Sequence, residues 1–397
     1  MPKINPIEIS RRHLIYCTLF SRLLVISGIS NIDKNSIFLL MKKLLIFSRR
    51  FYPDEYSGTE TFIHNLYNRL QQYYSIRLVC GWYKSPDLLP PGTRCIRLSG
   101  LPRELGYWKL ARFARKEIRA FEPDVILSNS IEIPRVKPFP TAVIFYDVNF
   151  GATKRSLMVK VKEWYYRMKC DRVNSIVAIS EASSAQLQGL GIAKGKIKVV
   201  YSGIDLKSFK VTNPEAKSGP FILCYPSRIA PGKGQHVAIQ ALKCLPPEVR
   251  ERCELWIAGK AQDPEYLNRL KRESAGLEVK FFTDVPDIVP YYQKADLIVF
   301  PTLLEEGFGY TAVEGMACGK PIAYSNDKAV LEATGGLGFP FERGDSSALA
   351  QIILNLFNQR TVLKDEGEKA RKFVESRYSW EKTALQYRDI LESISRK

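Results

Sequence analysis

Short runs rich in Ile, Val and Phe alternate with longer helical stretches along most of this chain. This alternation is typical of parallel βαβ units, in which a helix carries the chain from one strand to the next. It restricts the chain to an α/β fold built on parallel sheets. The predicted strands are 43–48, 77–80, 124–128, 142–146, 175–180, 198–201, 221–225, 254–259, 279–282, 296–300 and 321–324.

The strand pattern restarts after a polar connector at 211–220, which contains Pro and Gly. Connectors of this composition separate domains. The chain of 397 residues also exceeds what one hydrophobic core usually supports. We therefore predict two doubly wound domains that face each other across a cleft, with ligands bound beyond the carboxyl ends of the strands.

Residues 1–40 precede the first predicted strand and are expected to be an extension outside the core fold. Their apolar run, 13–29, is interrupted by Arg22 and is short for a membrane span. No A-x-A cleavage site follows it, and Met41 opens a sequence that reads as a second start. An amphipathic membrane anchor is the alternative interpretation.

The net charge of +18 lies entirely in the first half of the chain. Residues 1–210 carry 34 Lys and Arg against 16 Asp and Glu, whereas the remainder carries 25 of each sign. A field of this kind attracts polyanions, either nucleic acid or an anionic membrane leaflet. The alternative is a basic surface that faces water and binds no partner.

The eight cysteines and three histidines are scattered, with no C-x-x-C pair. This spacing argues against a disulfide framework or a zinc site and favours a reducing compartment. We expect no metal site, no cofactor and a cytoplasmic location. We treat a peripheral contact with the inner face of the membrane as a hypothesis.

The segment 300–323 carries the densest group of candidate site residues. A predicted strand leads into a loop with Gly307 and Gly309, and a helix begins near Tyr310. Amide groups at a helix start bind phosphate, and glycines allow close approach. Glu306 and Glu314 could hold sugar and ribose hydroxyls at the two ends of a nucleotide sugar. By spacing alone, it is equally plausible that Glu306 is a charge at a helix N-terminus and Glu314 a charge on the surface.

A second candidate segment, SRIAPGKG at 227–234, follows the first strand of the second domain. Arg228 and Lys233 flank a Pro-Gly turn, so both cations could converge on one diphosphate. A solvated basic loop is the alternative.

Together these segments resemble glycosyltransferase family 4, over residues from about 41 to the C-terminus. The resemblance implies the GT-B fold, which has two facing Rossmann-like domains and a C-terminal helix that crosses back to the N-terminal domain. The E-x7-E motif would be Glu306 and Glu314. In this family Glu306 addresses the donor sugar as the catalytic carboxylate, Glu314 holds the ribose, and Gly307, Phe308 and Gly309 contribute donor contacts. Arg228 and Lys233 match its diphosphate-binding pair.

Three further stretches support the resemblance. Residues 201–209 resemble the family's junction into the linker, and 377–391 resemble its C-terminal helix. Residues 50–60 resemble its first Gly-rich loop, which places Gly58 on the acceptor side. The implied division is 41–210 for the acceptor-side domain, 211–378 for the donor domain and 379–397 for the crossover helix.

One position departs from the family pattern. Many members have His-Asp after the strand that ends near residue 146, whereas this chain has Tyr146 and Asp147. The departure puts acceptor-side catalysis in doubt. Asp147 would orient the acceptor hydroxyl, or it is simply a turn residue.

The resemblance predicts a retaining glycosyltransferase that moves a hexose from a nucleoside-diphosphate sugar to a saccharide or lipid-linked acceptor, in surface polysaccharide assembly. We expect the transfer to be metal-independent, because the sequence has no D-x-D. Two alternatives remain: a nucleic-acid-binding protein, suggested only by charge, and a GT-B protein that binds a nucleotide sugar without turning it over. The nucleic-acid alternative leaves Glu306 and Glu314 unexplained and lacks the usual motifs, so we expect no nucleic-acid partner.

Overall fold

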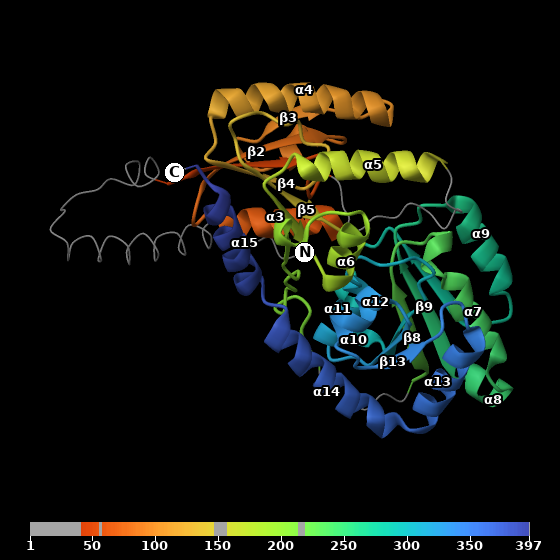
Figure 1. Ribbon diagram of the computed structural model, residues 1–397. Helices are drawn as coiled ribbons and strands as arrows, with labels where there is room; N and C mark the ends of the chain where they lie inside the picture. Colours follow the sequence, from red (N-terminus) through yellow and green to blue (C-terminus); the bar gives the residue numbers. More distant parts are fainter. Residues whose placement is uncertain (1–40, 55–57, 147–156, 213–218, 397) are drawn as a thin grey trace.

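The computed structural model describes residues 41–54, 58–146, 157–212 and 219–396. Within these residues the chain forms two α/β domains, each built on one parallel sheet (Figure 1). The N-terminal sheet has the strand order β3-β2-β1-β4-β5-β6-β7, and the C-terminal sheet has the order β10-β9-β8-β11-β12-β13. The predicted pair of doubly wound domains is confirmed.

The elements of the N-terminal domain have the following bounds. Its strands are β1 (Lys43–Ser48), β2 (Ser75–Trp82), β3 (Arg94–Arg97), β4 (Val125–Ser128), β5 (Thr141–Phe145), β6 (Ser175–Ala178) and β7 (Ile197–Val199). Its helices are α3 (Gly58–Leu70), η1 (Pro86–Leu88), α4 (Arg103–Phe121), α5 (Leu157–Asp171), α6 (Glu181–Gly189) and η2 (Lys194–Lys196). The edge strand β3 was not predicted.

The alternation of side chains along β1 divides the N-terminal core into two layers. Leu44 and Ile46 face the layer formed by α3 and the C-terminal helix, whereas Leu45 and Phe47 face α4. The connection from β4 to β5, residues 129–140, contains no helix and covers the same face as α4. Every residue of β5 is buried, as expected for a strand covered on both faces.

The elements of the C-terminal domain follow the same pattern. Its strands are β8 (Phe221–Pro226), β9 (Cys253–Gly259), β10 (Val279–Thr283), β11 (Leu297–Phe300), β12 (Ile322–Ser325) and β13 (Phe339–Phe341). Its helices are η3 (Pro231–Lys233), α7 (Gln235–Cys244), α8 (Pro247–Arg250), α9 (Pro264–Glu273), α10 (Val289–Lys294), α11 (Tyr310–Ala317), α12 (Lys328–Thr334), α13 (Ser346–Asn358) and α14 (Arg360–Arg377). The short strand β13 was not predicted.

The last helix, α15 (Trp380–Ile394), leaves the C-terminal domain and packs against α3 of the N-terminal domain (Figure 1). The Trp380 ring lies 5.4 Å from the Phe62 ring, centroid to centroid. Near the other end of the helix, the Tyr74 hydroxyl donates to Glu392 Oε1 at 2.8 Å. The expected crossover helix is therefore present.

A carboxylate from the C-terminal domain caps a helix of the N-terminal domain. Glu332, on α12, accepts the backbone N–H of Glu181 at 2.7 Å and that of Ala182 at 2.9 Å. These amides are two of the unpaired donors at the start of α6. The negative charge also lies at the positive end of the α6 dipole. The two domains therefore meet through a specific polar contact as well as through the crossover helix.

We expect Trp380→Ala to lower the free energy of unfolding by about 3–5 kcal/mol, as for other buried aromatic truncations. Trp380 is 4% exposed. Its backbone also approaches Gly203 so closely that a Cβ there would lie 2.5 Å from Trp380 Cα. Urea unfolding measures the loss, with Leu385→Ala as the control on the more exposed side of the same helix. Equal losses in the two variants would contradict the assigned role of Trp380.

Candidate functional site

The two domains bring the starts of two helices together. Gly58 begins α3, and a Cβ at Gly58 would lie 3.5 Å from Cδ2 of Tyr310, which begins α11. Both helices start beyond the carboxyl ends of strands, where α/β sheets bind their ligands. The candidate acceptor-side residue Gly58 and the candidate donor loop therefore lie next to each other.

The loop before α11 has a backbone that depends on glycine. Gly309 has φ of +89°, and a Cβ there would lie 3.1 Å from Val330 Cγ2. Both the left-handed conformation and the close approach disfavour any larger residue. The loop thus brings the first amides of α11 to the interface between the domains.

The N-terminal domain holds this loop from the opposite side. The Ser180 hydroxyl donates to the Gly307 carbonyl oxygen at 2.7 Å. Ser183 Oγ lies 3.1 Å from the same oxygen and 2.6 Å from the Tyr146 carbonyl oxygen. The Phe308 ring is 2% exposed and packs against Tyr378 at 5.3 Å between centroids. The Phe308 side chain therefore belongs to the core, which leaves its backbone for the predicted donor contact.

Glu306 of this loop forms a mostly buried ion pair with Lys233, the last residue of η3. Lys233 Nζ lies 2.6 Å from Glu306 Oε1, and the two side chains are 12% and 14% exposed. The Thr302 hydroxyl donates to the same carboxylate oxygen at 2.7 Å. Breaking such a pair leaves the remaining charge poorly solvated, which costs free energy, so the pair is held firmly. The structure thus joins the two sequence segments that carry the predicted donor site.

A second carboxylate supports Glu306 through its backbone. Asp327 Oδ2 accepts the Glu306 N–H at 3.3 Å and an Arg343 N–H at 2.8 Å. Its Oδ1 accepts the amides of Ala329 and Val330 and so caps α12. Burial raises the pKa of Asp327, although these hydrogen bonds and the Arg343 charge act in the opposite direction.

Arg228 lies apart from the ion pair of Lys233 and Glu306. Its side chain is exposed, and its Nη1 lies 3.4 Å from Gln262 Oε1. Its carbonyl oxygen accepts a hydrogen bond from the Gln235 side chain at 2.8 Å, which fixes the backbone of the loop. The predicted convergence of Arg228 and Lys233 on one diphosphate thus remains a prediction.

Glu314 lies in the second turn of α11 and faces α10. Its Oε2 accepts a hydrogen bond from the Tyr292 hydroxyl at 2.6 Å. Burial raises the pKa of Glu314 to about 7, while the Tyr292 hydrogen bond lowers it. Its carboxyl group is therefore partly protonated near neutral pH, and its role with ribose stays a prediction.

Tyr146 replaces the histidine of the family pattern with a partly buried phenol. Its hydroxyl donates to Asn129 Oδ1, and its ring lies 5.9 Å from that of Phe62. Burial, followed by the nearby Tyr310, Tyr387 and Glu60, raises its pKa. A neutral phenol bonded in this way does not supply the base that a histidine would. Asp147 lies outside the described residues.

Sequence reasoning missed the residues that hold the loop in place. Ser180, Ser183 and Asp327 carry the signature of helix N-caps, because each stands at or near a helix start with a side chain able to accept an amide hydrogen. That signature predicts the helix start but says nothing about the opposite domain. Thr302 stood inside the singled-out segment without a proposed role.

The described residues contain no group of three His, Cys, Asp or Glu placed to hold a metal ion. Among the same residues, no helix combines the length and the apolar character that crossing a membrane requires.

Two protein-family models match consecutive parts of the chain, which together run from residue 56 to residue 377. The model described as Glycosyltransferase Family 4 matches residues 56–208, and the model described as Glycosyl transferases group 1 matches residues 208–377. The boundary between the two models falls close to the predicted connector.

The relatives include CapM of Staphylococcus aureus, a capsular polysaccharide biosynthesis glycosyltransferase. It is 27% identical over 241 residues, which are 55% of this chain and 62% of CapM. The similarity thus covers less than two thirds of that relative's length.

Solved structures with the same fold include HepE of Anabaena in complex with UDP and glucose, with a TM-score of 0.72 at 21% identity. The match covers 89% of this chain and 100% of HepE. Sucrose-phosphate synthase of Thermosynechococcus elongatus matches with a TM-score of 0.75 at 19% identity, over 89% of this chain and 98% of that structure. These likenesses confirm the expected GT-B fold.

Glu314→Gln is expected to remove a pH dependence of stability between about pH 4.5 and pH 7. The folded chain binds a proton at Glu314 more tightly than the unfolded chain, because burial raises this pKa from 4.5 to about 7. The wild type should therefore lose stability as the pH rises through this window, by at most about 3 kcal/mol. The variant should lack this loss.

Urea unfolding at several pH values measures the difference between the two proteins. Glu368→Gln, at an exposed position on α14, serves as the matched control. A Glu314→Gln variant that follows the wild-type pH profile would contradict the assignment.

Proposed function

This chain belongs to glycosyltransferase family 4, and on that premise we propose that it transfers a hexose from a nucleoside-diphosphate sugar to a saccharide or lipid-linked acceptor. The transfer retains the anomeric configuration and serves the assembly of a surface polysaccharide. The observation that carries this proposal is the ion pair of Lys233 and Glu306 beside the start of α11. The biosynthetic context is supported by the similarity to CapM.

The proposed donor site uses the positive charge of Lys233 and the first amides of α11 to hold the diphosphate. As the glycosidic bond breaks, negative charge builds up on the leaving nucleoside diphosphate. Fixed donors aimed at that charge lower the barrier without reorganisation. Lys233 can exchange its contact with Glu306 for a phosphate oxygen, and Arg228 would add a second cation from the exposed side. We infer from this supply of positive charge that transfer needs no metal ion.

Glu306 then faces the donor sugar with its carboxylate. Once Lys233 turns to the diphosphate, the Thr302 hydrogen bond and the backbone contact to Asp327 keep Glu306 in place. The carboxylate can bind sugar hydroxyls and stabilise positive charge at the reacting carbon. Glu314 would bind the ribose, and Gly58 would line the acceptor side. UDP is one candidate nucleotide, because HepE was solved in complex with UDP and glucose.

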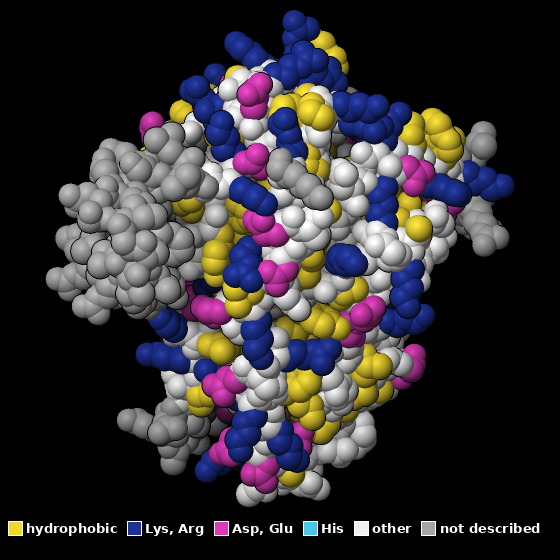
Figure 2. Space-filling model, turned by 60° about the vertical axis from the view of Figure 1, so that its left-hand side comes forward, with side chains coloured by type: hydrophobic (Ala, Val, Ile, Leu, Met, Phe, Trp, Pro, Cys, Tyr) yellow, Lys and Arg dark blue, Asp and Glu magenta, His cyan; other side chains and the backbone are white. Residues whose placement is uncertain are grey.

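In this proposal the protein works in the cytoplasm, on the inner face of an anionic membrane. The outer side of α4 exposes Arg112, Arg115, Lys116 and Arg119. Trp108, on the same helix, is 65% exposed and lies beside the Arg112 guanidinium. Figure 2 shows Lys and Arg gathered at the top of the molecule, the end that α4 occupies in Figure 1.

The other residues considered for membrane contact divide between surface and core. Phe113 is partly buried and packs into the core beneath α4, so it is not available for insertion. Residues 1–40, the alternative anchor, lie outside the described residues. On α5, which covers the same face of the sheet, Trp164 is 63% exposed. The proposed membrane face thus presents cations with an exposed indole on each helix.

Glu306→Gln is expected to lower kcat by about a hundredfold or more at saturating donor, because the charge that acts on the transition state is lost. Nucleotide release, measured with UDP-, GDP- and ADP-sugars and with EDTA present, gives the rate. Glu305→Gln, at the exposed neighbouring position, should keep wild-type activity. Normal turnover by Glu306→Gln would contradict the catalytic role of Glu306. If the wild type releases no nucleotide from any of these donors, the proposed transferase activity is wrong.

The chain is expected to bind anionic vesicles at low salt and to dissociate at high salt. Each basic residue near an anionic leaflet contributes about 1 kcal/mol, screened over roughly a Debye length. Co-sedimentation with neutral and anionic vesicles measures binding, for the full chain and for one that begins at Met41. Equal binding to both kinds of vesicle would contradict the electrostatic account. Loss of binding only in the shorter chain would move the anchor to residues 1–40.

A further inference from the structure

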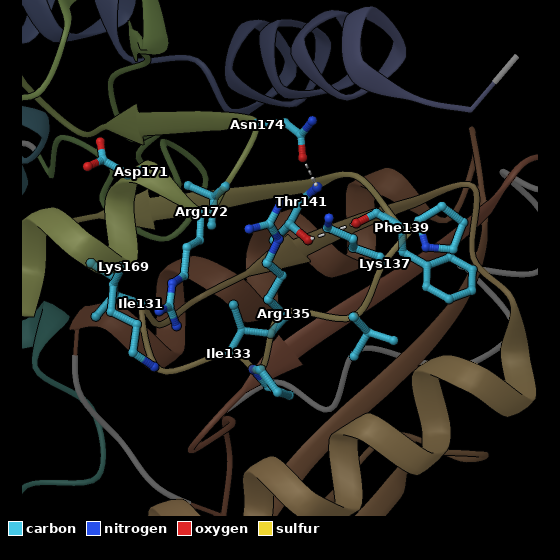
Figure 3. Close-up of a pocket in the computed structure, with 14 residues that line it drawn as sticks. Ile131, Ile133, Arg135, Lys137, Phe139, Thr141, Lys169, Asp171, Arg172 and Asn174 are labelled. Atoms are coloured by element: carbon cyan, nitrogen blue, oxygen red, sulfur yellow. Dashed lines mark hydrogen bonds between the residues drawn. The ribbon is translucent and has the colours of Figure 1, made fainter.

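A pocket of about 280 Å³ lies in the N-terminal domain, at the amino-terminal ends of its central strands and opposite the cleft between the domains. It is formed by the connection from β4 to β5 and by the end of α5 with the residues that follow it (Figure 3). Thr141, the first residue of β5, lines it, whereas the other end of β5 points to the cleft. At about 3.3 Å per residue, the length of β5 places the pocket roughly 15 Å from the cleft. The pocket is therefore a separate site.

Four cationic side chains line this pocket: Arg135, Lys137, Lys169 and Arg172. Asp171 is the one acidic residue among the described lining residues. Lys169 Nζ lies 3.6 Å from Glu132. The other three cations make no ion pair or side-chain hydrogen bond with any described residue. Like charges repel, so an anion bound among these cations would relieve that repulsion.

The backbone around these cations is fixed before any ligand arrives. Ile133 and Val136, on either side of Arg135, are buried in the core beneath α4. The N–H of Thr141 donates to Asn174 Oδ1 at 3.0 Å, and the Asn174 N–H donates to the Thr141 carbonyl oxygen at 2.8 Å (Figure 3). These two bonds tie the connection to the segment that follows α5. The pocket needs little rearrangement to bind, which favours affinity.

The lining chemistry selects phosphate. Arginine binds phosphate through two parallel N–H groups, and lysine adds a point charge. Within the described part of the chain, three of the four cations have no competing ion-pair or hydrogen-bond partner, enough positive charge to neutralise a dianion. The one aromatic side chain of the lining, Phe139, already has the Arg396 guanidinium over its ring at 5.2 Å, so it is not free to stack on a base. The volume holds a phosphate with a small attached group but is small for a nucleotide sugar.

We propose that this pocket binds a phosphate-bearing group as a second anion site, independent of the donor cleft. The pocket lies on the face of the sheet that α4 and α5 cover, because Ile131 and Val136 of its lining pack into the same cores as those helices. The phosphate can therefore come from a lipid headgroup or from a soluble phosphoester. Both sources present the same chemistry.

The test uses two double variants of the full chain. Arg135→Ala/Arg172→Ala removes two exposed pocket arginines, and Lys271→Ala/Arg272→Ala removes two exposed cations at the end of α9, in the other domain. The net charge changes equally, and neither pair is buried, so both variants are expected to fold. Calorimetric titration with inorganic phosphate and with glycerol phosphate measures the soluble source. Co-sedimentation with phosphatidylglycerol vesicles measures the lipid source.

A soluble source predicts that the pocket variant binds glycerol phosphate about tenfold more weakly, while the α9 variant binds as the wild type does. Tenfold corresponds to about 1.4 kcal/mol, the lower end for hydrogen bonds to a charged group. A lipid source predicts that the pocket variant loses more vesicle binding than the α9 variant. Any phosphate bound in the donor cleft is common to all three proteins and cancels. Equal behaviour of the two variants in both measurements would overturn the proposal, because total charge alone would then explain the binding.

Discussion

The hydrogen bond from Ser180 to the Gly307 carbonyl oxygen joins the two domains at the point where their ligand-binding edges meet. It fixes the loop that carries Glu306 from the side opposite its own sheet. Together with Ser183, Ser180 restrains from the N-terminal domain a loop whose Gly309 could otherwise adopt several conformations. The ion pair with Lys233 and the orientation of the first amides of α11 both depend on this loop.

The site places charged side chains where they have little contact with solvent. Lys233, Glu306 and Asp327 all have side chains that are mostly buried, and each is compensated by an opposite charge or by backbone amides. Charges held in this way need little rearrangement when a charged ligand binds. The exposed cations of α4 and of the basic pocket have the opposite character, because they are solvated and largely uncompensated. The chain thus separates a mostly buried group of compensated charges from a surface of solvated cations.

The sequence predicted the fold well because strand burial leaves a direct signal. Runs such as 297–300 are apolar throughout, since both faces of β11 are covered. The short edge strands β3 and β13 escaped prediction because β3 has an arginine at each end and β13 has Pro340 at its centre, so neither forms an apolar run of Ile and Val.

The candidate site was predictable only in part. Glu306 and Lys233 were both singled out, but their ion pair joins residues 73 positions apart, and no spacing rule gives such a contact. The hydrogen bond between Ser180 and Gly307 spans 127 positions and crosses the domain boundary. The family pattern located Tyr146 as a departure, whereas only the structure showed that its hydroxyl is bonded to Asn129.

The cap that Glu332 places on α6 makes the folding of one helix end dependent on the position of the other domain. A rigid-body separation of the domains would leave the amides of Glu181 and Ala182 without their acceptor, and the first turn of α6 would then fray more easily. Exchange of those two amide hydrogens with solvent would follow each such separation. The start of α6 is therefore a built-in reporter of how often the cleft opens.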